Sequence, residues 1–216
     1  MFFDLRESPS RKPSIFNAIV APRPIAWVSS ASLDGRINLA PFSYFTLLSS
    51  SPPTVIFSCV NPVDRQDKDT LRNIRSSKEY VINMVSREFL EAMHLTSKPA
   101  PYGVNEFEMA NVASASSETV RPPRVDGTPA ALECRLLQLV EVAPERDGEL
   151  GATAVIGRVT GLYVAEHLID SSGRFRSIDA GLMARLGGSL YSELGNITPL
   201  APIAHNQYAA ESTRTG

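Results

Sequence analysis

A short run of charged and hydroxyl side chains, Lys68-Asp69-Thr70, opens a segment with helical spacing and is a first candidate ligand site. The backbone N–H groups at the start of a helix attract anions. Asp69 is a residue type that caps helices, and Lys68 and Arg72 add positive charge near the hydroxyl of Thr70. Together these groups could hold a phosphate monoester. The alternative is an ordinary helix start with solvated side chains, because such caps are common.

Two strand-like segments carry further candidate residues. The first, Arg23 to Ser30, has the sequence RPIAWVSS and contains Trp27, the single tryptophan. The second, Asn38 to Phe45, has the sequence NLAPFSYF, in which a proline interrupts strand-forming residues. A flat heteroaromatic ligand needs hydrogen-bond partners at its edge and apolar contacts on its faces, and such an interrupted strand offers both. The alternatives are a Trp27 that anchors the core and an irregular edge strand with packed aromatic rings.

Residues that usually carry metal or acid–base chemistry are sparse. His94, His167 and His205 are the three histidines, and none has metal-ligand spacing with another His or Cys. The sequence contains no GxSxG, GxGxxG or GxxxxGK[ST] motif, so it shows neither a serine nucleophile elbow nor a common nucleotide-binding loop. An enzyme without an evident acid, base, nucleophile or metal can use a cofactor whose own atoms react. Flavin is such a cofactor, since the protein chiefly positions it.

Strands dominate the elements that would position these residues. Pro24–Ser32 and Ile37–Leu48 flank the pair Asp34-Gly35, which is typical of a hairpin turn. The second run contains Pro41, so we expect an edge strand or an interrupted one. Four more runs have the pattern of strands: Thr54–Val60, Glu79–Val85, Ala130–Val142 and Ala152–Val164, the last two joined by a turn over Glu145–Gly151.

Alternation within Ala130–Val142 places Leu132, Cys134, Leu136, Val140 and Val142 on one face and Glu133, Arg135 and Glu141 on the other. Short helices are predicted over Asp69–Ser77 and Arg87–Thr96, and a third is predicted within Ile178–Leu194. About six antiparallel strands with hairpins favour a mainly β protein built as a barrel. No repeat or linker divides the chain, so we expect a single domain over residues 1–216, with a core over about residues 14–194 and a tail over 195–216.

Composition narrows the class of protein. The chain of 216 residues has a formal net charge of −2, so no basic excess indicates a nucleic-acid partner. Cys59 and Cys134 form no CxxC pair, and two cysteines are too few for a secreted disulfide scaffold. Neither a signal peptide nor an uncharged apolar run of about twenty residues occurs, so we expect a cytoplasmic protein without a membrane partner.

Taken in order, the segments RPIAWVSS, DGRINLAPFSYF, SPPTVIFS, KDTLRNI and EYVINM resemble the flavin reductase-like family. The segment ARLGGSLY, which ends at Tyr191, resembles that family's closing segment. The likeness runs from about Arg23 to Tyr191, and the order and spacing of the motifs carry it. It implies an antiparallel Greek-key split β-barrel with short flanking helices, and a homodimer that binds FMN near the subunit interface.

The resemblance also implies which residues bind the cofactor. The isoalloxazine would be bordered by Arg23, Pro24, Ile25, Ala26, Trp27, Asn38, Ala40, Pro41, Phe42 and Ser43. The ribityl phosphate would be contacted by Ser58, Lys68, Asp69 and Thr70, and Asn73 belongs to the same cofactor-binding set. Arg185 and Tyr191 would close the site or assist the nicotinamide donor.

Members of this family reduce flavins with NADH or NADPH, serve two-component monooxygenases, or pass electrons as flavoredoxins. We therefore expect an NAD(P)H-dependent FMN oxidoreductase that transfers hydride from a nicotinamide to flavin N5, with no side chain as an obligatory acid or base. One alternative is a flavoredoxin-type electron carrier that acts with a protein partner. Another is a barrel that binds a different phosphorylated ligand and catalyses nothing. The Pro-rich region 98–127, which has no familiar motif, would shape the substrate entrance.

Overall fold

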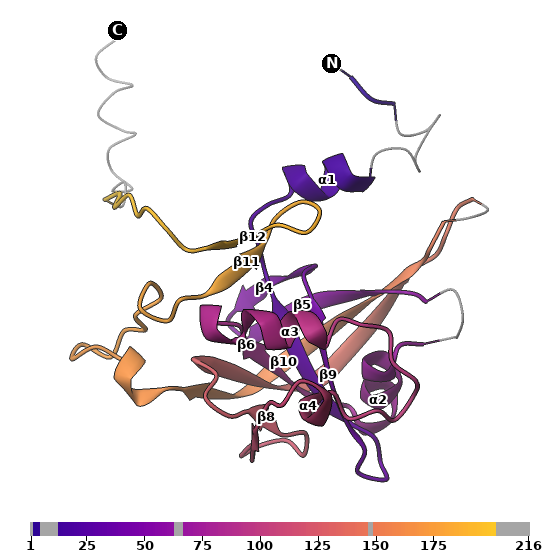
Figure 1. The fold of residues 1–216 in the computed structure, drawn as a ribbon, viewed down its shortest axis with the longest axis horizontal. Helices are drawn as coiled ribbons and strands as arrows, with labels where there is room; N and C mark the ends of the chain where they lie inside the picture. Colours follow the sequence, from indigo (N-terminus) through magenta and orange to yellow (C-terminus); the bar gives the residue numbers. More distant parts are fainter. Residues whose placement is uncertain (1, 5–12, 63–66, 147–148, 202–216) are drawn as a thin grey trace, which may run out of the picture.

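The computed structural model describes residues 2–4, 13–62, 67–146 and 149–201. Its main element is a seven-stranded sheet with the strand order β3-β2-β6-β9-β10-β5-β4 (Figure 1). Every pairing in it is antiparallel. Its strands are β2 (Ala26–Ala31), β3 (Ile37–Phe42), β4 (Phe45–Ser50), β5 (Pro53–Val60), β6 (Glu79–Met84), β9 (Ala130–Val142) and β10 (Ala152–Val164).

Smaller elements surround this sheet. One three-stranded sheet has the order β1-β11-β12, and a two-stranded sheet pairs β7 with β8. These strands are β1 (Arg23–Pro24), β11 (Met183–Arg185), β12 (Tyr191–Glu193), β7 (Ser114–Ala115) and β8 (Arg124–Val125). The helices are α1 (Pro13–Ile19), α2 (Asp69–Ser77), α3 (Leu90–Leu95), α4 (Glu106–Met109) and the 3-10 turns η2 (Arg87–Phe89) and η3 (Glu166–Leu168).

The main sheet curls into a barrel that is split between its two edge strands. These edges, β3 and β4, are consecutive in the chain and are linked by Ser43 and Tyr44. Phe42 on β3 packs against Phe57 on β5, with ring centroids 5.1 Å apart, so the first edge lies against the strand next to the other edge. The mainly β antiparallel barrel that the sequence predicts is therefore confirmed.

The predicted hairpins and strand ends agree closely with the structure. β2 and β3 pair across the Asp34-Gly35 turn, where Gly35 has a φ of 87° that favours glycine. The run Ile37–Leu48, predicted as one strand, forms β3 and β4 instead. The break falls at Ser43 and Tyr44, and the Tyr44 carbonyl accepts a hydrogen bond from the Ser58 N–H at 2.8 Å. Pro41 lies on β3, the edge strand, as its missing N–H requires.

The long strands β9 and β10 have the predicted bounds, but their far ends project from the barrel (Figure 1). Val140 and Val142 are consequently exposed. Part of the predicted turn, residues 147–148, lies outside the described residues. Glu133, predicted on the polar face, is buried because its carboxylate accepts hydrogen bonds from the N–H groups of Glu118 and Thr119.

Two of the three predicted helices are present. The helix α2 has the predicted bounds, and Arg87–Thr96 forms η2 followed by α3. The prediction of a helix within Ile178–Leu194 is wrong, because this segment contains the hairpin β11–β12. Gly181 and Gly188 there have φ of 56° and 60°, which lie outside the helical region, and β11 pairs with β1. Gly187 allows a close approach, since a Cβ there would lie 2.6 Å from that of Ala18 on α1.

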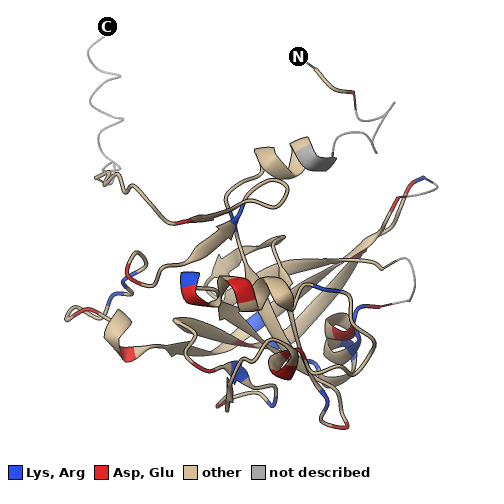
Figure 2. Ribbon diagram, in the orientation of Figure 1, with Lys and Arg blue, Asp and Glu red and all other residues tan. Residues whose placement is uncertain are grey.

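Beside a small cluster of Val81, Val120 and Ala131, the apolar core lies in two larger clusters on opposite faces of the sheet strands. One contains Phe57, Ile74 and Tyr80 and lies between the barrel strands and α2. The other contains Trp27, Leu39 and Met93 and lies beneath α3 and α4. Acidic and basic residues are interspersed over the helices and loops (Figure 2), in keeping with the small net charge. Within the described ranges, none of the helices has the length and apolar character needed to cross a lipid bilayer.

Candidate functional site

Two cavities adjoin each other along β3, and both are lined by Pro41 and Ser97. The first, here called the arginine cavity, has a volume of about 530 Å³. Its lining is Asn17, Arg23, Ile25, Pro41, Ser43, Tyr44, Met93, His94, Ser97, Arg185, Leu186, Gly188 and Tyr191. The second, here called the lysine cavity, has a volume of about 510 Å³. Its lining is Asn38, Ala40, Pro41, Phe42, Val60, Asn61, Pro62, Lys68, Asp69, Thr70, Thr96, Ser97, Lys98, Pro99, Ala100, Glu106 and Leu150.

The start of α2 forms one wall of the lysine cavity. Lys68 is the N-cap residue of this helix and makes no side-chain capping hydrogen bond. Its ammonium group lies 5.7 Å from the centroid of the Phe42 ring, which places a positive charge beside an aromatic face. The helix dipole adds partial positive charge at the same end. This wall of the cavity therefore favours an anion.

A buried hydrogen-bond network holds the opposite wall. The Thr70 hydroxyl donates to Asn38 Oδ1 at 2.7 Å, and Asn38 Nδ2 donates to Glu106 Oε2 at 3.0 Å. The same carboxylate oxygen accepts the N–H of Leu39 at 3.0 Å. Thus β3, α2 and α4 are fixed to one another at the cavity, and the Thr70 hydroxyl proton is already used inside the protein.

Glu106 is a residue of the site that the sequence did not reveal. It is 4% exposed, and burial raises the pKa of its carboxyl group. The hydrogen bonds from Leu39 and Asn38 lower the pKa in part, while the negative charge of Asp69 raises it further. Glu106 belongs to the region 98–127, whose residues from Lys98 to Ala100 also line the lysine cavity. No motif or spacing marks Glu106 in the sequence, because its partners come from β3.

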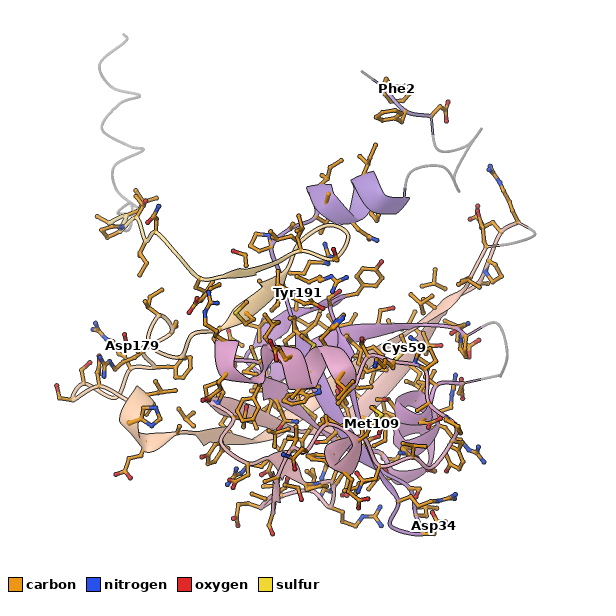
Figure 3. All side chains as sticks on the ribbon, in the orientation of Figure 1. Phe2, Asp34, Cys59, Met109, Asp179 and Tyr191 are labelled. Carbon is orange, nitrogen blue, oxygen red and sulfur yellow. The ribbon has the colours of Figure 1, made fainter. Side chains whose placement is uncertain are left out.

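The arginine cavity lies where the β11–β12 hairpin meets α1 and α3, and Figure 3 shows Tyr191 at this place. The Arg23 guanidinium donates to the backbone carbonyl groups of Asn17 and Val20, and to that of Leu186 at 3.0 Å. These bonds tie α1 and the β11–β12 hairpin to β1. Arg23 is therefore both a structural clamp and a part of the cavity wall.

Arg185 and two rings form the other side of this cavity. Its guanidinium donates to the Tyr191 hydroxyl and the Gly188 carbonyl, and its central carbon lies 4.4 Å from the centroid of the Tyr191 ring. The Tyr191 hydroxyl lies 3.4 Å from Nδ1 of His94. Across the cavity, the Tyr44 hydroxyl donates to Asn17 Oδ1 at 2.9 Å. The arginine cavity is thus lined both by hydrogen-bond donors and by the rings of Tyr44, His94 and Tyr191.

Most residues singled out in the sequence line one of these cavities. Those in the lysine cavity are Asn38, Ala40, Phe42, Lys68, Asp69 and Thr70. Those in the arginine cavity are Arg23, Ile25, Ser43, Arg185 and Tyr191, and Pro41 lines both cavities. Asn73 lines a small crevice beside Asn38 and Asp69, and its amide donates to the Ser30 hydroxyl at 3.1 Å.

Besides Asn73, four of the singled-out residues line neither cavity. Ala26 and Trp27 are both 0% exposed, because β2 lies between two other strands and its side chains pack into the core on both faces. The Trp27 indole N–H donates to the Thr96 hydroxyl at 2.9 Å, so this ring supports a residue of the lysine cavity without lining it. Pro24 is exposed on β1, and Ser58 is half-buried on β5.

Comparison with known proteins identifies the family. A family model described as "Flavin reductase like domain" matches residues 20–179. A protein of Aquifex aeolicus is 37% identical over 173 residues, which cover 80% of this chain and 85% of that protein.

Among solved structures, nitrilotriacetate monooxygenase component B from Bacillus cereus has a TM-score of 0.86 at 27% identity, covering 93% of this chain and 98% of that one. The Pseudomonas fluorescens 2-nitrobenzoate 2-nitroreductase has a TM-score of 0.82 at 28% identity, covering 95% and 98%. The family match spans more than half of the chain and includes both the β2–β3 hairpin and α2. This chain belongs to the flavin reductase-like family.

Proposed function

We propose that the protein binds FMN and acts as an NAD(P)H-dependent flavin oxidoreductase. The observation that carries this proposal is the pair of adjoining cavities along β3, each lined by positively charged side chains. A dinucleotide donor and a flavin must meet face to face, so their sites must adjoin. Family membership supports the same activity.

The lysine cavity fits the phosphate end of FMN. Lys68 and the start of α2 would hold the phosphate, since charge-assisted hydrogen bonds to an anion are stronger than neutral ones. Because the Thr70 side chain already donates to Asn38, its contribution to the phosphate would come from its backbone N–H. Asp69 and Glu106 add negative charge to the same cavity. Burial raises the pKa of the Glu106 carboxyl group.

The outer edge of β3 fits the flat end of FMN. β3 pairs only with β2 in the described sheet. On its other side the Leu39 N–H donates to Glu106 and Pro41 has no N–H, so a ring edge there would meet backbone carbonyl groups. Pro41 is common to both cavities, and Ser43 lines the arginine cavity just beyond it. These residues would orient the ring between the two cavities.

FMN, when bound, supplies a centre that accepts hydride from the nicotinamide. The chain's own residues then bind, align and exclude water, and no side chain is required to take or give a proton in that transfer. Arg185 and Tyr191 would position the nicotinamide donor from the arginine cavity. The Bacillus cereus protein is a component of nitrilotriacetate monooxygenase, and a monooxygenase that consumes reduced flavin is a partner we propose here too.

We also propose a homodimer. Leu47 and Leu48 on β4 are 63% and 52% exposed, and β4 is an open edge of the main sheet. The projecting ends of β9 and β10 expose further apolar residues: Leu137, Val140, Val142 and Leu162. Exposed apolar surface on this scale, next to an unpaired strand edge, is typical of an interface.

The test of the proposed function begins with FMN and the purified protein. The flavin spectrum should change on binding, and FMN should bind more tightly than riboflavin. Anaerobic addition of NADH or NADPH should then bleach the bound flavin. Flavin that binds without being reduced by either nucleotide would exclude the reductase activity and leave an electron carrier, whereas failure to bind flavin would contradict the cofactor assignment itself.

A further inference from the structure

We propose that the arginine cavity binds the carboxylate of a small planar acid beside the flavin site. This inference deepens the proposed function and rests on it. Its starting point is charge, because the described residues of the lining include Arg23 and Arg185 and neither Asp nor Glu. Elsewhere on the described surface, arginine side chains such as Arg87 and Arg121 pair with carboxylates.

Arg23 carries a positive charge that no carboxylate among the described residues neutralises. The residue is 9% exposed, and its guanidinium is bonded to three backbone carbonyl groups. Carbonyl groups satisfy N–H donors but carry no net charge. Its Nε is buried and has no hydrogen-bond partner among the described residues. A buried cation is ordinarily paired with an anion, so a ligand that brings one to this cavity is favoured.

Arg185 and Tyr191 supply donors on the opposite side. Because the Tyr191 hydroxyl accepts a hydrogen bond from Arg185, its own proton is free to be donated to a ligand or to His94. Arg185 is held in place by the Gly188 carbonyl and by stacking on the Tyr191 ring. A guanidinium fixed in this way is oriented before a ligand arrives and can bind the two oxygens of a carboxylate.

The rest of the lining indicates what the carboxylate is attached to. The rings of Tyr44, His94 and Tyr191 are flat, and Ile25 and Met93 are apolar. A planar acid would place its ring against these side chains and its charge toward the arginines. The volume of about 530 Å³ lies in the range of small-molecule sites, about 300–1,000 Å³.

The same oxyanion chemistry could come from the phosphate groups of a nicotinamide nucleotide, so the experiment compares the two sources. Benzoate, its neutral analogue benzamide, and inorganic phosphate are each titrated into FMN-loaded protein while the visible spectrum of the flavin is recorded. Benzoate should perturb the spectrum saturably and bind at least about tenfold more tightly than benzamide, as expected for a charged hydrogen bond. Equal binding of benzoate and benzamide, or phosphate binding more tightly than benzoate, would overturn the carboxylate assignment.

Two variants locate the site. Arg185→Gln should weaken benzoate at least about tenfold, while Arg176→Gln, which removes an exposed arginine paired with Asp179, should not. Unchanged benzoate affinity in Arg185→Gln would refute the proposal. Calorimetric titration of benzoate into FMN-free protein separates this inference from the proposed function. Binding of benzoate without any binding of FMN would overturn the flavin assignment alone, and binding of FMN without benzoate would overturn the inference alone.

Discussion

Replacement of Lys68 by alanine is the sharpest test of the phosphate site. Lys68 is half-buried at the start of α2 and makes no capping hydrogen bond, so the helix keeps its hydrogen bonds in the variant. Thr70→Ala would be less clean, because it removes the hydrogen bond to buried Asn38. Loss of one charged hydrogen bond is worth about 1.5–3 kcal/mol, which corresponds to an FMN dissociation constant raised about 10- to 150-fold.

The contact of Lys68 with Phe42 determines how much Lys68→Ala should lower the stability of the protein without FMN. Its ammonium group lies 5.7 Å from that ring, and an exposed cation–π contact is worth about 0.5–1 kcal/mol. The variant should therefore unfold at a slightly lower temperature but remain folded when FMN is added. Riboflavin, which has no phosphate, should bind the variant and the parent protein almost equally.

The assay is titration of FMN and of riboflavin, followed by flavin fluorescence. Lys78→Asn is the matched control, because it removes a lysine from the other end of α2, where the backbone has a φ of 63° that asparagine tolerates. Its FMN affinity should equal that of the parent protein. The phosphate assignment is refuted if Lys68→Ala binds FMN as tightly as the parent, or if it loses FMN and riboflavin affinity by the same factor.

Other expected outcomes concern the assembly, the chemistry and the buried carboxyl group. The double variant Leu47→Glu and Leu48→Glu should convert a dimer into a monomer, and light scattering that finds the parent protein monomeric with FMN bound would contradict the interface. Anaerobic flavin reduction should slow by less than about tenfold, or about 1.4 kcal/mol of barrier, in each of the variants His94→Gln, His167→Gln and His205→Gln, the last outside the described residues. Ser43→Leu should slow it more. A loss of about a thousandfold in a folded histidine variant would require a side-chain acid or base. Glu106→Gln should raise the thermal stability at pH 7 and leave it nearly unchanged at pH 4. The raised pKa means that the folded state binds the proton more tightly than the unfolded state, so the stability of the parent protein falls as the pH rises above the ordinary pKa of a glutamate. Thermal melts with the same difference at both pH values would contradict the assignment.

Local signals in the sequence predicted the strands well because their determinants lie within a few residues. The Asp34-Gly35 pair sets the β2–β3 turn, and the bounds of β9, β10 and α2 follow from residue type and period. The division of Ile37–Leu48 into β3 and β4 was only half anticipated. Pro41 marked the run as irregular, but the break falls at Ser43 and Tyr44, where the chain passes from one edge of the barrel to the other.

Tertiary contacts decided the elements that the sequence did not reveal. Ile178–Leu194 contains residues that favour helix, yet pairing of Arg185 with Arg23 makes this segment a strand. Trp27 looked suited to a flavin pocket, but the position of β2 inside the sheet buries it. Glu106 could not be singled out, since its carboxylate is defined by Asn38 and by the N–H of Leu39, which lie far from it in the chain.

The distribution of charge between the cavities explains why two ligand sites can adjoin without merging. The lysine cavity mixes Lys68 and Lys98 with Asp69 and Glu106, so positive and negative side chains share its lining. The described residues of the arginine cavity include Arg23 and Arg185 and no carboxylate, so positive charge dominates its lining. Because Lys68 and Arg185 line different cavities, their contributions to binding should be nearly additive. Pro41 and Ser97 are the points at which the sites touch, and coupling between two bound ligands must pass through them or through direct stacking of the ligands themselves.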